Sequence, residues 1–433
     1  MILTGKLDQV TLKMSQEDVT GRMGLSWIEH SMRHFRLTEI LDRRMPVGGE
    51  SNREIAASRK VMAGVLSLIA GAQRVEDIEV LREDRGLLNA IGWQSMISPD
   101  TLLEYAKIKD NAGKLRKAQE EFTIKLMRDS EFKEFTYDGD ATYFDSEKES
   151  ATYSYQKKKQ HSGMLGFISE LGICNTMDFR PGHVSPQTGI LNQLRKAVKQ
   201  AQGAGKKITR ARFDSAGHKN EVFEFCEEEG MHYYISLDKN QARMECIQAI
   251  KPKDWQEIAR AEEDLERKKE WVETVYVTNK GNAVRTLVLR WLNPQPDLFK
   301  QDTYCYHAIG TNNNEIDPMR WLEFHNGRMN SENYNKELKE GLNAGYAPSH
   351  DFDTDRFYFL LNVLAYNVLQ VMKLFYLGEA ARTWTVKTLR YWFIGVCGKI
   401  VRTGRKYYCK IINATEKTFA LFRHCLSQLR IVL

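Results

Sequence analysis

A chain of 433 residues is too long for one simple hydrophobic core, and its length predicts about two to four domains. Its content of 42% hydrophobic and 28% charged residues is that of an ordinary globular protein, and a net charge of +6 is too small to identify a partner. The 7 cysteines include no CxxC pair and the 10 histidines no HExxH motif, which argues against a disulfide framework, a zinc knuckle and a zinc hydrolase. The cysteine pattern favours a reducing compartment, and the first residues lack the apolar run of a signal peptide.

Residues 1–130 are predicted to be mostly helical. The segment 52–69 carries an apolar stripe at helical spacing, a second helix is expected at 75–88, and Ser98-Pro99 is typical of a helix start. Short helices with tight breaks are compatible with a helix-turn-helix unit that binds DNA. A helical bundle without that role is the alternative.

From residue 134 the hydrophobic period changes to that of strands, and 131–238 predicts an α/β unit with a mixed sheet and crossover helices. The predicted strands are 135–140, 161–168, 173–179, 208–214 and 232–237, with helices at 190–202 and 220–229. Asp140 and Asp214 each close a predicted strand. If the first and fourth strands lie side by side, these two carboxylates meet at neighbouring ends.

The sheet pattern is interrupted over 239–318, which predicts a largely β insertion. A charge-rich helix is expected at 255–269, and strand-like runs follow at 272–277, 284–292 and 304–309. The next segment, 319–378, resumes the core. Its apolar stretch 357–377 contains Asn362, Asn367, Gln370 and Lys373, which favours a buried core helix over a membrane span.

The last segment, 379–433, is strongly basic, with a single acidic residue after Ala380. Its cations, Arg402, Arg405 and Lys406 among them, alternate with tyrosine and tryptophan, a mixture that suits a groove for a polyanion. We expect a basic helical region that binds DNA or supports dimerisation. A solvated helical tail is the alternative.

The run 325–339 is predicted to be helical and to place Arg328, Glu332, Lys336 and Lys339 on one face. Glu332 would then point at metal ions while the cations reach phosphates. Two strand-end aspartates and one helical glutamate suit a two-metal site for phosphoryl transfer, with magnesium or manganese as the ion. Exposed ion pairs and ordinary turn aspartates are the alternatives.

These residues resemble the DDE transposases of bacterial insertion sequences, in the branch called transposase DDE domain group 1. The wider superfamily has the signature Tyr, two residues, Arg, three residues, Glu, six residues, Lys, which Arg328, Glu332 and Lys339 fit. His325 stands where tyrosine is usual, and imidazole is shorter and titrates near neutrality. Asp140-Ala-Thr matches the step at the family's first aspartate, and Arg212-Phe-Asp214-Ser matches its second.

The resemblance implies a ribonuclease-H-like core, interrupted by the β insertion, that cuts transposon ends and joins them to target DNA. Asp140, Asp214 and Glu332 would hold two Mg²⁺ ions, with Mn²⁺ able to substitute. The implied partners are double-stranded DNA, as inverted-repeat ends and target, and a second copy of the chain, in the cytoplasm and nucleoid of a bacterium, with no membrane. The expected DNA contacts are His325, Arg328, Lys336, Lys339, Lys157, Lys158, Lys159, Arg402, Arg405 and Lys406.

Several alternatives stay open at this point. Asp138 would face the same side of its strand as Asp140, and Glu337 competes with Glu332. Relatives with the insertion often stack an aromatic side chain on a flipped base, and the candidates here are Trp291, Tyr304 and Trp321, each of which could instead be core packing. The rival functions are a nuclease that does not transpose and a domesticated protein that only binds DNA.

Overall fold

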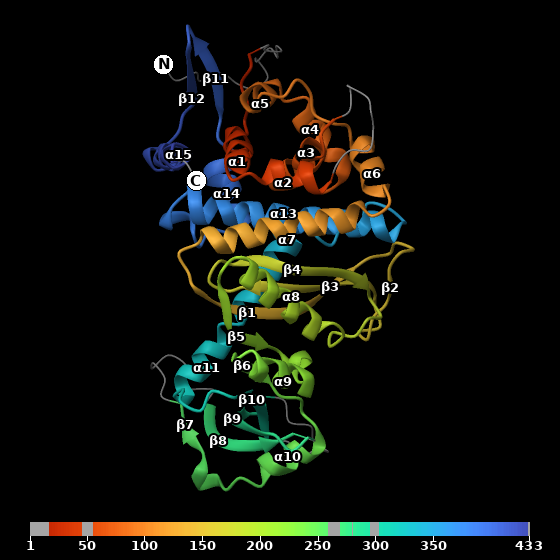
Figure 1. The fold of residues 1–433 in the computed structure, drawn as a ribbon, viewed down its shortest axis with the longest axis vertical. Helices are drawn as coiled ribbons and strands as arrows, with labels where there is room; N and C mark the ends of the chain where they lie inside the picture. The colour runs from red at the N-terminus through yellow and green to blue at the C-terminus, as the bar shows by residue number, and fades with distance from the viewer. Residues whose placement is uncertain (1–16, 46–54, 259–268, 279, 295–302, 432–433) are drawn as a thin grey trace, which may run out of the picture.

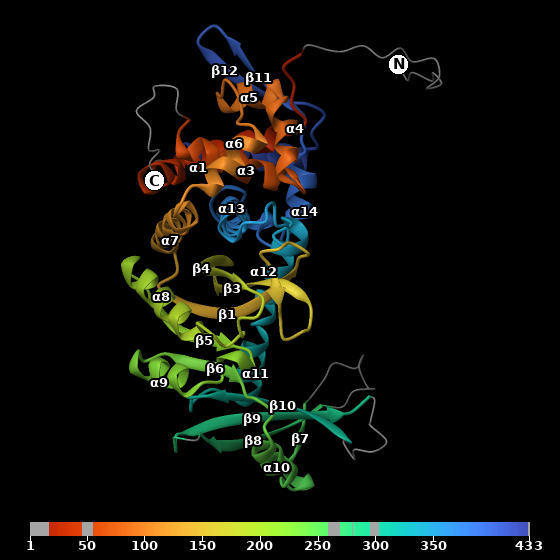
Figure 2. The same ribbon diagram turned by 90° about the vertical axis from the view of Figure 1, so that its right-hand side faces the viewer.

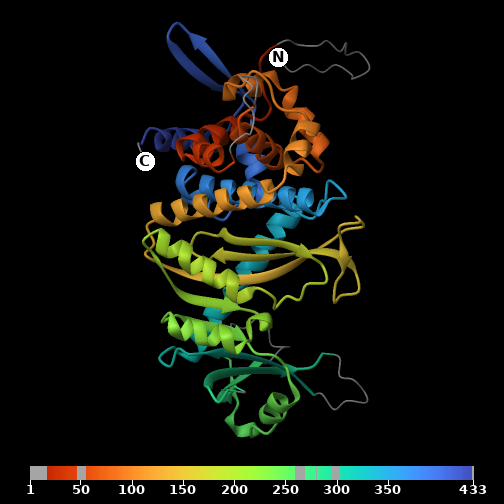
Figure 3. The same cartoon turned by 45° about the vertical axis from the view of Figure 1, so that its right-hand side comes forward.

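The computed structural model describes residues 17–45, 55–258, 269–278, 280–294 and 303–431. The molecule is elongated, with helices from the N-terminal part at one end, a sheet in the middle and the insertion at the other end (Figure 1). The central helix α13 and the helix α7 beside it lie between the other N-terminal helices and the sheet (Figure 3).

The N-terminal part is helical, as expected. Its helices are α1 (Met23–His34), α2 (Leu37–Arg44), α3 (Ala57–Ala70), η2 (Val75–Ile78), α4 (Glu79–Arg82), α5 (Arg85–Ile91), α6 (Pro99–Lys107) and α7 (Asn111–Asp129). The Ser98 side chain caps α6, as the sequence predicts. The single helix expected at 75–88 is broken, because the Asp84 carboxylate accepts from the Leu87 amide and starts a new helix there.

The central sheet runs in the order β2-β3-β1-β5-β6-β10-β9-β8-β7, with β4 also paired to β3. Its strands are β1 (Glu134–Asp145), β2 (Thr152–Tyr153), β3 (Lys159–Ile168), β4 (Ile173–Pro181), β5 (Lys207–Phe213), β6 (His232–Ser236), β7 (Gln256–Glu257), β8 (Lys269–Val277), β9 (Ala283–Leu292) and β10 (Tyr304–Thr311). Strands β1, β5 and β6 are parallel neighbours, β3 runs antiparallel beside β1, and β4 pairs antiparallel with β3. The predicted adjacency of the first and fourth strands of the core, β1 and β5, is therefore confirmed.

The insertion does not form a separate sheet. Its strand β10 pairs antiparallel with β6, so that β8, β9 and β10 continue the central sheet outward. Helix α10 (Gln241–Gln248) and the short turn η4 (Pro252–Asp254) precede these strands. The sequence predicts a helix at 255–269, but Gln256 and Glu257 belong to β7 and Lys269 begins β8, so the prediction is wrong at both ends. Residues 259–268 lie outside the described residues.

Helices cover both faces of the sheet (Figure 2). Helices α8 (Ile190–Gly203) and α9 (Asn220–Glu228) lie on one face, and α11 (Pro318–Asn326) and α12 (Met329–Lys336) on the other. The continuous helix expected over 325–339 is interrupted at Gly327 and Arg328, and α12 ends in a π-helical turn, η5 (Glu337–Gly341).

Helix α13 (Phe352–Val371), extended by the π-helical turn η6 (Met372–Tyr376), is the buried core helix that the sequence predicts. It packs against α3, α7 and β4, and Asn367 bonds to both the amide and the carbonyl of Cys174. Among the described ranges, the segment Phe352–Tyr376 is the one helix long and apolar enough to cross a membrane, and 89% of its apolar window is buried inside the protein. A core helix passes the same test of length and composition.

The sequence predicts a helical C-terminal segment, and the structure differs from that prediction. After η7 (Glu379–Ala381), α14 (Val386–Leu389) and η8 (Arg390–Ile394), it forms a hairpin of β11 (Gly398–Thr403) and β12 (Lys406–Ile411), followed by α15 (Glu416–Leu429). Arg402, Arg405 and Lys406 therefore lie on a β-hairpin and not on a helix. Gly404 begins its two-residue turn at φ 62°, a conformation that favours glycine in hairpins.

Candidate active site

The pairing of β1 with β5 brings Asp140 and Asp214 together. The parallel register ends with Gly139 opposite Phe213, so each aspartate is the next residue on its chain. Asp214 directly follows β5, and its carboxylate accepts from the Ala216 amide at 2.9 Å. The sequence predicts that Asp140 ends its strand. In the structure Asp140 lies inside the strand, because β1 continues to Asp145 along β3.

The structure separates Asp140 from its competitor Asp138. Asp138 is fully buried, and its carboxylate accepts from Arg212 Nε at 2.6 Å and Arg212 Nη2 at 2.7 Å. Arg212 also donates to Ser169 and to the Phe324 carbonyl. Asp138 is thus occupied by a buried ion pair that joins β1, β5 and α11.

Asp140 is held differently. Its Oδ2 accepts from the Asn335 side-chain amide of α12 at 2.7 Å. Burial, and then the negative charge of Asp214, raises the pKa of Asp140 to about 6, with a smaller contribution from Glu332; Arg328 opposes the shift. When Asp140 is ionised, the positive charge of Arg328 therefore balances its negative charge only in part.

Glu332 lies at the solvent-facing side of Asp140 and Asp214. Its side chain is 55% exposed, and its Oε1 accepts from Arg328 Nη2 at 2.9 Å. Burial raises the pKa of Asp214, and the charges of Asp238 and Glu332 add to that shift. The negative charges of Asp140, Asp214 and Glu332 therefore repel one another, and the positive charge of Arg328 offsets part of this repulsion.

Glu337, the competitor of Glu332, has a structural role. Its Oε2 accepts from the Val386 amide at 2.6 Å and so attaches η5 to α14. Glu337 lies on the π-helical turn, whereas Glu332 lies on α12. The geometry favours Glu332 as the third carboxylate.

Carboxylate oxygens are the donors that Mg²⁺ and Mn²⁺ prefer, and their mutual repulsion is what a divalent cation relieves. In the part of the chain that the structure describes, no three His, Cys, Asp or Glu residues lie close enough to form a metal-holding group. The donors fit the ion in chemistry, and the Glu332 carboxylate is paired with Arg328 in this structure.

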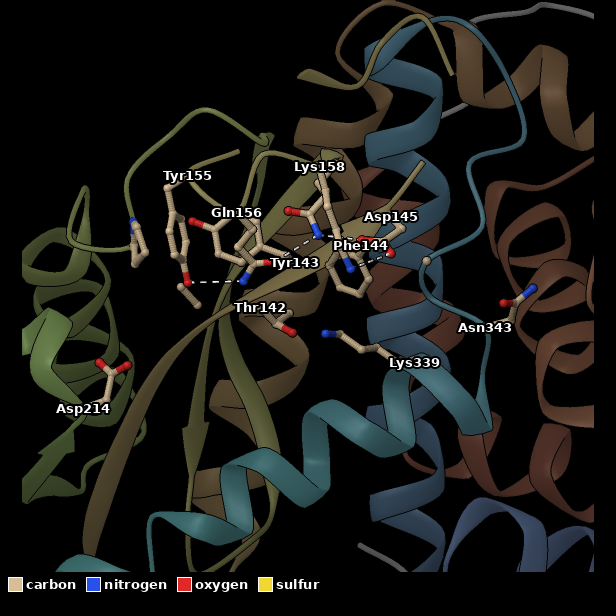
Figure 4. Close-up of a pocket in the computed structure, with 14 residues that line it drawn as sticks. Thr142, Tyr143, Phe144, Asp145, Tyr155, Gln156, Lys158, Asp214, Lys339 and Asn343 are labelled. Atoms are coloured by element: carbon tan, nitrogen blue, oxygen red, sulfur yellow. Dashed lines mark hydrogen bonds and ion pairs between the residues drawn. The ribbon is translucent and has the colours of Figure 1, made fainter. Parts of the chain in front are cut away.

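An open pocket of about 590 Å³ adjoins Asp214 (Figure 4). It is lined by Ala141, Thr142, Tyr143, Phe144, Asp145, Tyr155, Gln156, Lys158, Gln160, Pro186, Asp214, Lys339, Asn343 and Gly345. Two of the predicted cations, Lys158 and Lys339, thus lie on the same pocket as Asp214. The Lys339 ammonium lies 5.3 Å from the centre of the Phe144 ring, and burial lowers the pKa of Lys339.

The other two lysines of the predicted basic loop are near this pocket without lining it. Lys157 is an exposed turn residue at φ 59°, and the Lys159 ammonium donates to the Glu147 carbonyl at 3.2 Å. Lys336 is exposed on α12 and lies 3.9 Å from Glu340. The structure thus leaves Lys157 and Lys336 open to solvent on the side of the site.

His325 corrects a prediction. It is 4% exposed on α11, and its Nε2 lies 3.1 Å from the Ser236 hydroxyl of β6. Burial lowers its pKa to about 3, so the imidazole is neutral. A buried neutral ring facing the sheet does not offer the expected phosphate contact.

Of the aromatic candidates for base stacking, Trp321 is fully buried and is core packing. Trp291 and Tyr304 are partly exposed on β9 and β10, where Lys269 lies over the first ring at 5.6 Å and Arg290 over the second at 4.6 Å. Arg402, Arg405 and Lys406 do not line the pocket and lie on the β11–β12 hairpin, which is beside α5 (Figure 1).

Two features of the site were not predicted from the sequence. Asn335 lies three residues after Glu332, a helical spacing that could have identified it. Tyr155 lines the pocket, is 69% exposed, and its ring lies edge-on to Tyr143 at 5.4 Å. Strand alternation gave no signal for Tyr155, because it lies in the turn between β2 and β3.

The sequence matches the family described as transposase DDE domain group 1 over residues 4–432. No curated protein matches the chain. Among solved structures, a piggyBac transposase synaptic complex with hairpin DNA is similar, at 11% identity and a TM-score of 0.43, covering 81% of this chain and 75% of that one.

Proposed function

Because the chain belongs to the transposase DDE domain group 1 family, we propose that it is a DNA transposase that cuts the ends of its element and joins the 3′ ends to target DNA. The observation that carries this proposal is the electrostatic coupling of Asp140, Asp214 and Glu332 beside a pocket lined by lysines. Nucleic-acid phosphates are the substrate that such carboxylates and cations suit.

The sheet order supports a ribonuclease-H-like core. Strands β1, β5 and β6 are parallel, β3 runs antiparallel to β1, and β4 runs antiparallel to β3. With helices on both faces, these strands make a mixed sheet of that kind. The proposed division is a helical DNA-binding part at 1–130, a core at 131–238 and 319–378, the β insertion at 239–318, and a basic C-terminal part at 379–433.

In this proposal Asp140, Asp214 and Glu332 hold two Mg²⁺ ions, for which Mn²⁺ can substitute. Bound ions of this kind activate the attacking oxygen and stabilise the leaving oxygen. The residues of the chain do the remaining work: Asn335 orients Asp140, Arg328 positions Glu332, and Lys339 binds a phosphate oxygen from the pocket side.

The test is Glu332→Gln in the full chain. Magnesium-dependent cleavage of DNA carrying the element's ends should fall by at least about 100-fold, because an amide cannot replace a charged metal ligand. Binding of the same DNA should be unchanged. The matched control is Glu340→Gln, an exposed glutamate of the following turn, which should cleave normally. Cleavage that survives in Glu332→Gln would contradict the assignment.

A nuclease that does not transpose is distinguished by strand joining. DNA ends with free 3′ hydroxyls, supplied with a supercoiled target plasmid and Mg²⁺, should become covalently attached to the plasmid. Cleavage without joining would favour the nuclease, and DNA binding without cleavage a domesticated binding protein. Since two ends must be paired, we expect a homodimer on DNA, in the cytoplasm and nucleoid of a bacterium.

A further inference from the structure

The β11–β12 hairpin stands apart from the central sheet. Its strands pair with each other from Gly398 opposite Ile411 to Thr403 opposite Lys406 and form a 2-stranded sheet of their own. It projects past α5 at the end of the molecule opposite the insertion (Figures 1 and 3). An isolated two-stranded ribbon is marginally stable in water, so it needs an anchor, a partner or both.

The base of the hairpin is anchored to the N-terminal part. The Gly398 amide donates to the Thr20 carbonyl at 2.9 Å, and the Gly398 carbonyl accepts from the Thr20 amide at 3.0 Å. Ile400 and Cys409 pack against the hydrophobic core, and the Lys399 ammonium lies 3.2 Å from Glu17. The direction in which the outer half projects is therefore fixed.

The outer half is basic and aromatic. The segment 398–411 contains five Lys and Arg residues and no Asp or Glu. Within the described residues no acidic side chain forms an ion pair with Arg402, Arg405 or Lys406. Tyr407 is 70% exposed and Tyr408 47% exposed, and the Arg402 guanidinium lies 5.7 Å from the centre of the Tyr407 ring, so flat polar rings lie among cations.

We propose that this hairpin is a DNA-binding ribbon that lies in the major groove of the duplex, an inference that rests on the proposed transposase function. Strands about 4.8 Å apart form a ribbon that a groove about 12 Å wide admits. Arg405 and Lys406 at the turn bind phosphates, and Tyr407, which pairs with Arg402 on one face of the ribbon, contacts base edges. The rival occupant is a second copy of the chain, through its acidic helix α9.

The phosphate contacts are tested with Arg405→Ala/Lys406→Ala in the full chain, without divalent ions. The probes are a fluorescent duplex of about four helical turns taken from the DNA flanking the coding region and an unrelated duplex of equal length. Loss of two phosphate contacts should lower the slope of log affinity against log salt by about 1.8 for both probes. Affinity at low salt should fall at least about tenfold.

The matched control removes two cations elsewhere. Lys196→Ala/Lys199→Ala changes α8, on the face of the sheet opposite α12, and should leave the slope unchanged. Groove placement is tested by methylation of guanine N7, a major-groove atom. The wild-type chain should protect guanines in the bound duplex, and Tyr407→Ala should restore their methylation.

The outcomes separate the hairpin from the function. If the wild-type chain binds neither duplex, the proposed transposase function fails with it. If it binds and the hairpin variants bind equally well, or guanine N7 is never protected, the hairpin proposal is overturned while the function stands. If the variants change only the sedimentation of the free protein, the hairpin is a protein interface and the proposal is again overturned.

Discussion

At the scale of single residues, the environment of each carboxylate decides its use. Asp138 and Asp140 lie two residues apart on β1, yet Arg212 occupies the first while the second receives one amide hydrogen bond from Asn335. A buried, fully paired carboxylate is a structural element. A carboxyl group with a raised pKa beside other acids is a candidate for metal binding or catalysis.

The raised pKa of Asp140 predicts a pH-dependent stability in metal-free protein. With a pKa of about 6 in the folded state and about 3.9 when unfolded, the folded state binds more protons between these values. Stability from this group therefore falls as pH rises from about 4 to about 6. Asp140→Asn should be more stable than wild type by about 2 to 3 kcal/mol at pH 8, measured by urea unfolding with a chelator.

The same comparison at pH 4 is the control, because Asp140 is then protonated and the two proteins should unfold at similar urea concentrations. Asp145→Asn, at the exposed end of β1, is the matched control and should not raise the free energy of unfolding at pH 8. A wild-type protein that is the more stable of the two at pH 8 would contradict the raised pKa.

Asn335 is predicted to be a positioning residue for Asp140. Asn335→Ala removes the donor at 2.7 Å and should reduce cleavage by about 10- to 100-fold. It should also move the acidic limb of the pH–rate profile to higher pH, since a carboxylate that loses a hydrogen-bond donor is harder to ionise. Asn333→Ala, an exposed position on the same helix, is the control. If the pH–rate profile does not shift, Asn335 contributes only to packing and the prediction is wrong.

At the scale of elements, the sequence predicted β3, β4, β5, β6, α8, α9 and α13 well, because their hydrophobic period is regular and their burial follows from it. The C-terminal hairpin was missed because a high density of cations suggested a helical tail. The alternation around Ile400 and the turn at Gly404 were present in the sequence. The break between α11 and α12 has no comparable signal, since Gly327 alone is tolerated in many helices.

The buried pair of Asp138 and Arg212 predicts a large energetic effect on the packing of β1, β5 and α11. Arg212→Met leaves the Asp138 carboxylate buried without a partner, so the free energy of unfolding should fall by about 3 to 5 kcal/mol in urea at pH 7. The double variant Asp138→Leu/Arg212→Met should recover most of this loss, because no buried charge remains. A double variant as unstable as the single one would show that contacts other than the charge pair dominate.

At the scale of the whole molecule, the site depends on segments that lie far apart in the chain. Asp140 and Asp214 meet through strand pairing, which the strand pattern allowed us to predict, but α12, which carries Glu332, comes only after the insertion has returned to the core through β10. The approach of α12 to β1, made by Asn335, depends on tertiary packing that no local pattern encodes. The sequence therefore allowed the meeting of Asp140 and Asp214 to be predicted but not the contact of Asn335 with Asp140.

Because the three carboxylates come from β1, β5 and α12, metal binding should stabilise the whole fold. A ligand present at 100 times its dissociation constant adds about 2.7 kcal/mol to the free energy of unfolding, so Mg²⁺ should raise the melting temperature of wild type. Asp140→Asn/Asp214→Asn should not respond. The shift should also weaken as pH falls below about 6, because protons compete with the ion for Asp140. An equal Mg²⁺ shift in both proteins would place the ion elsewhere on the chain.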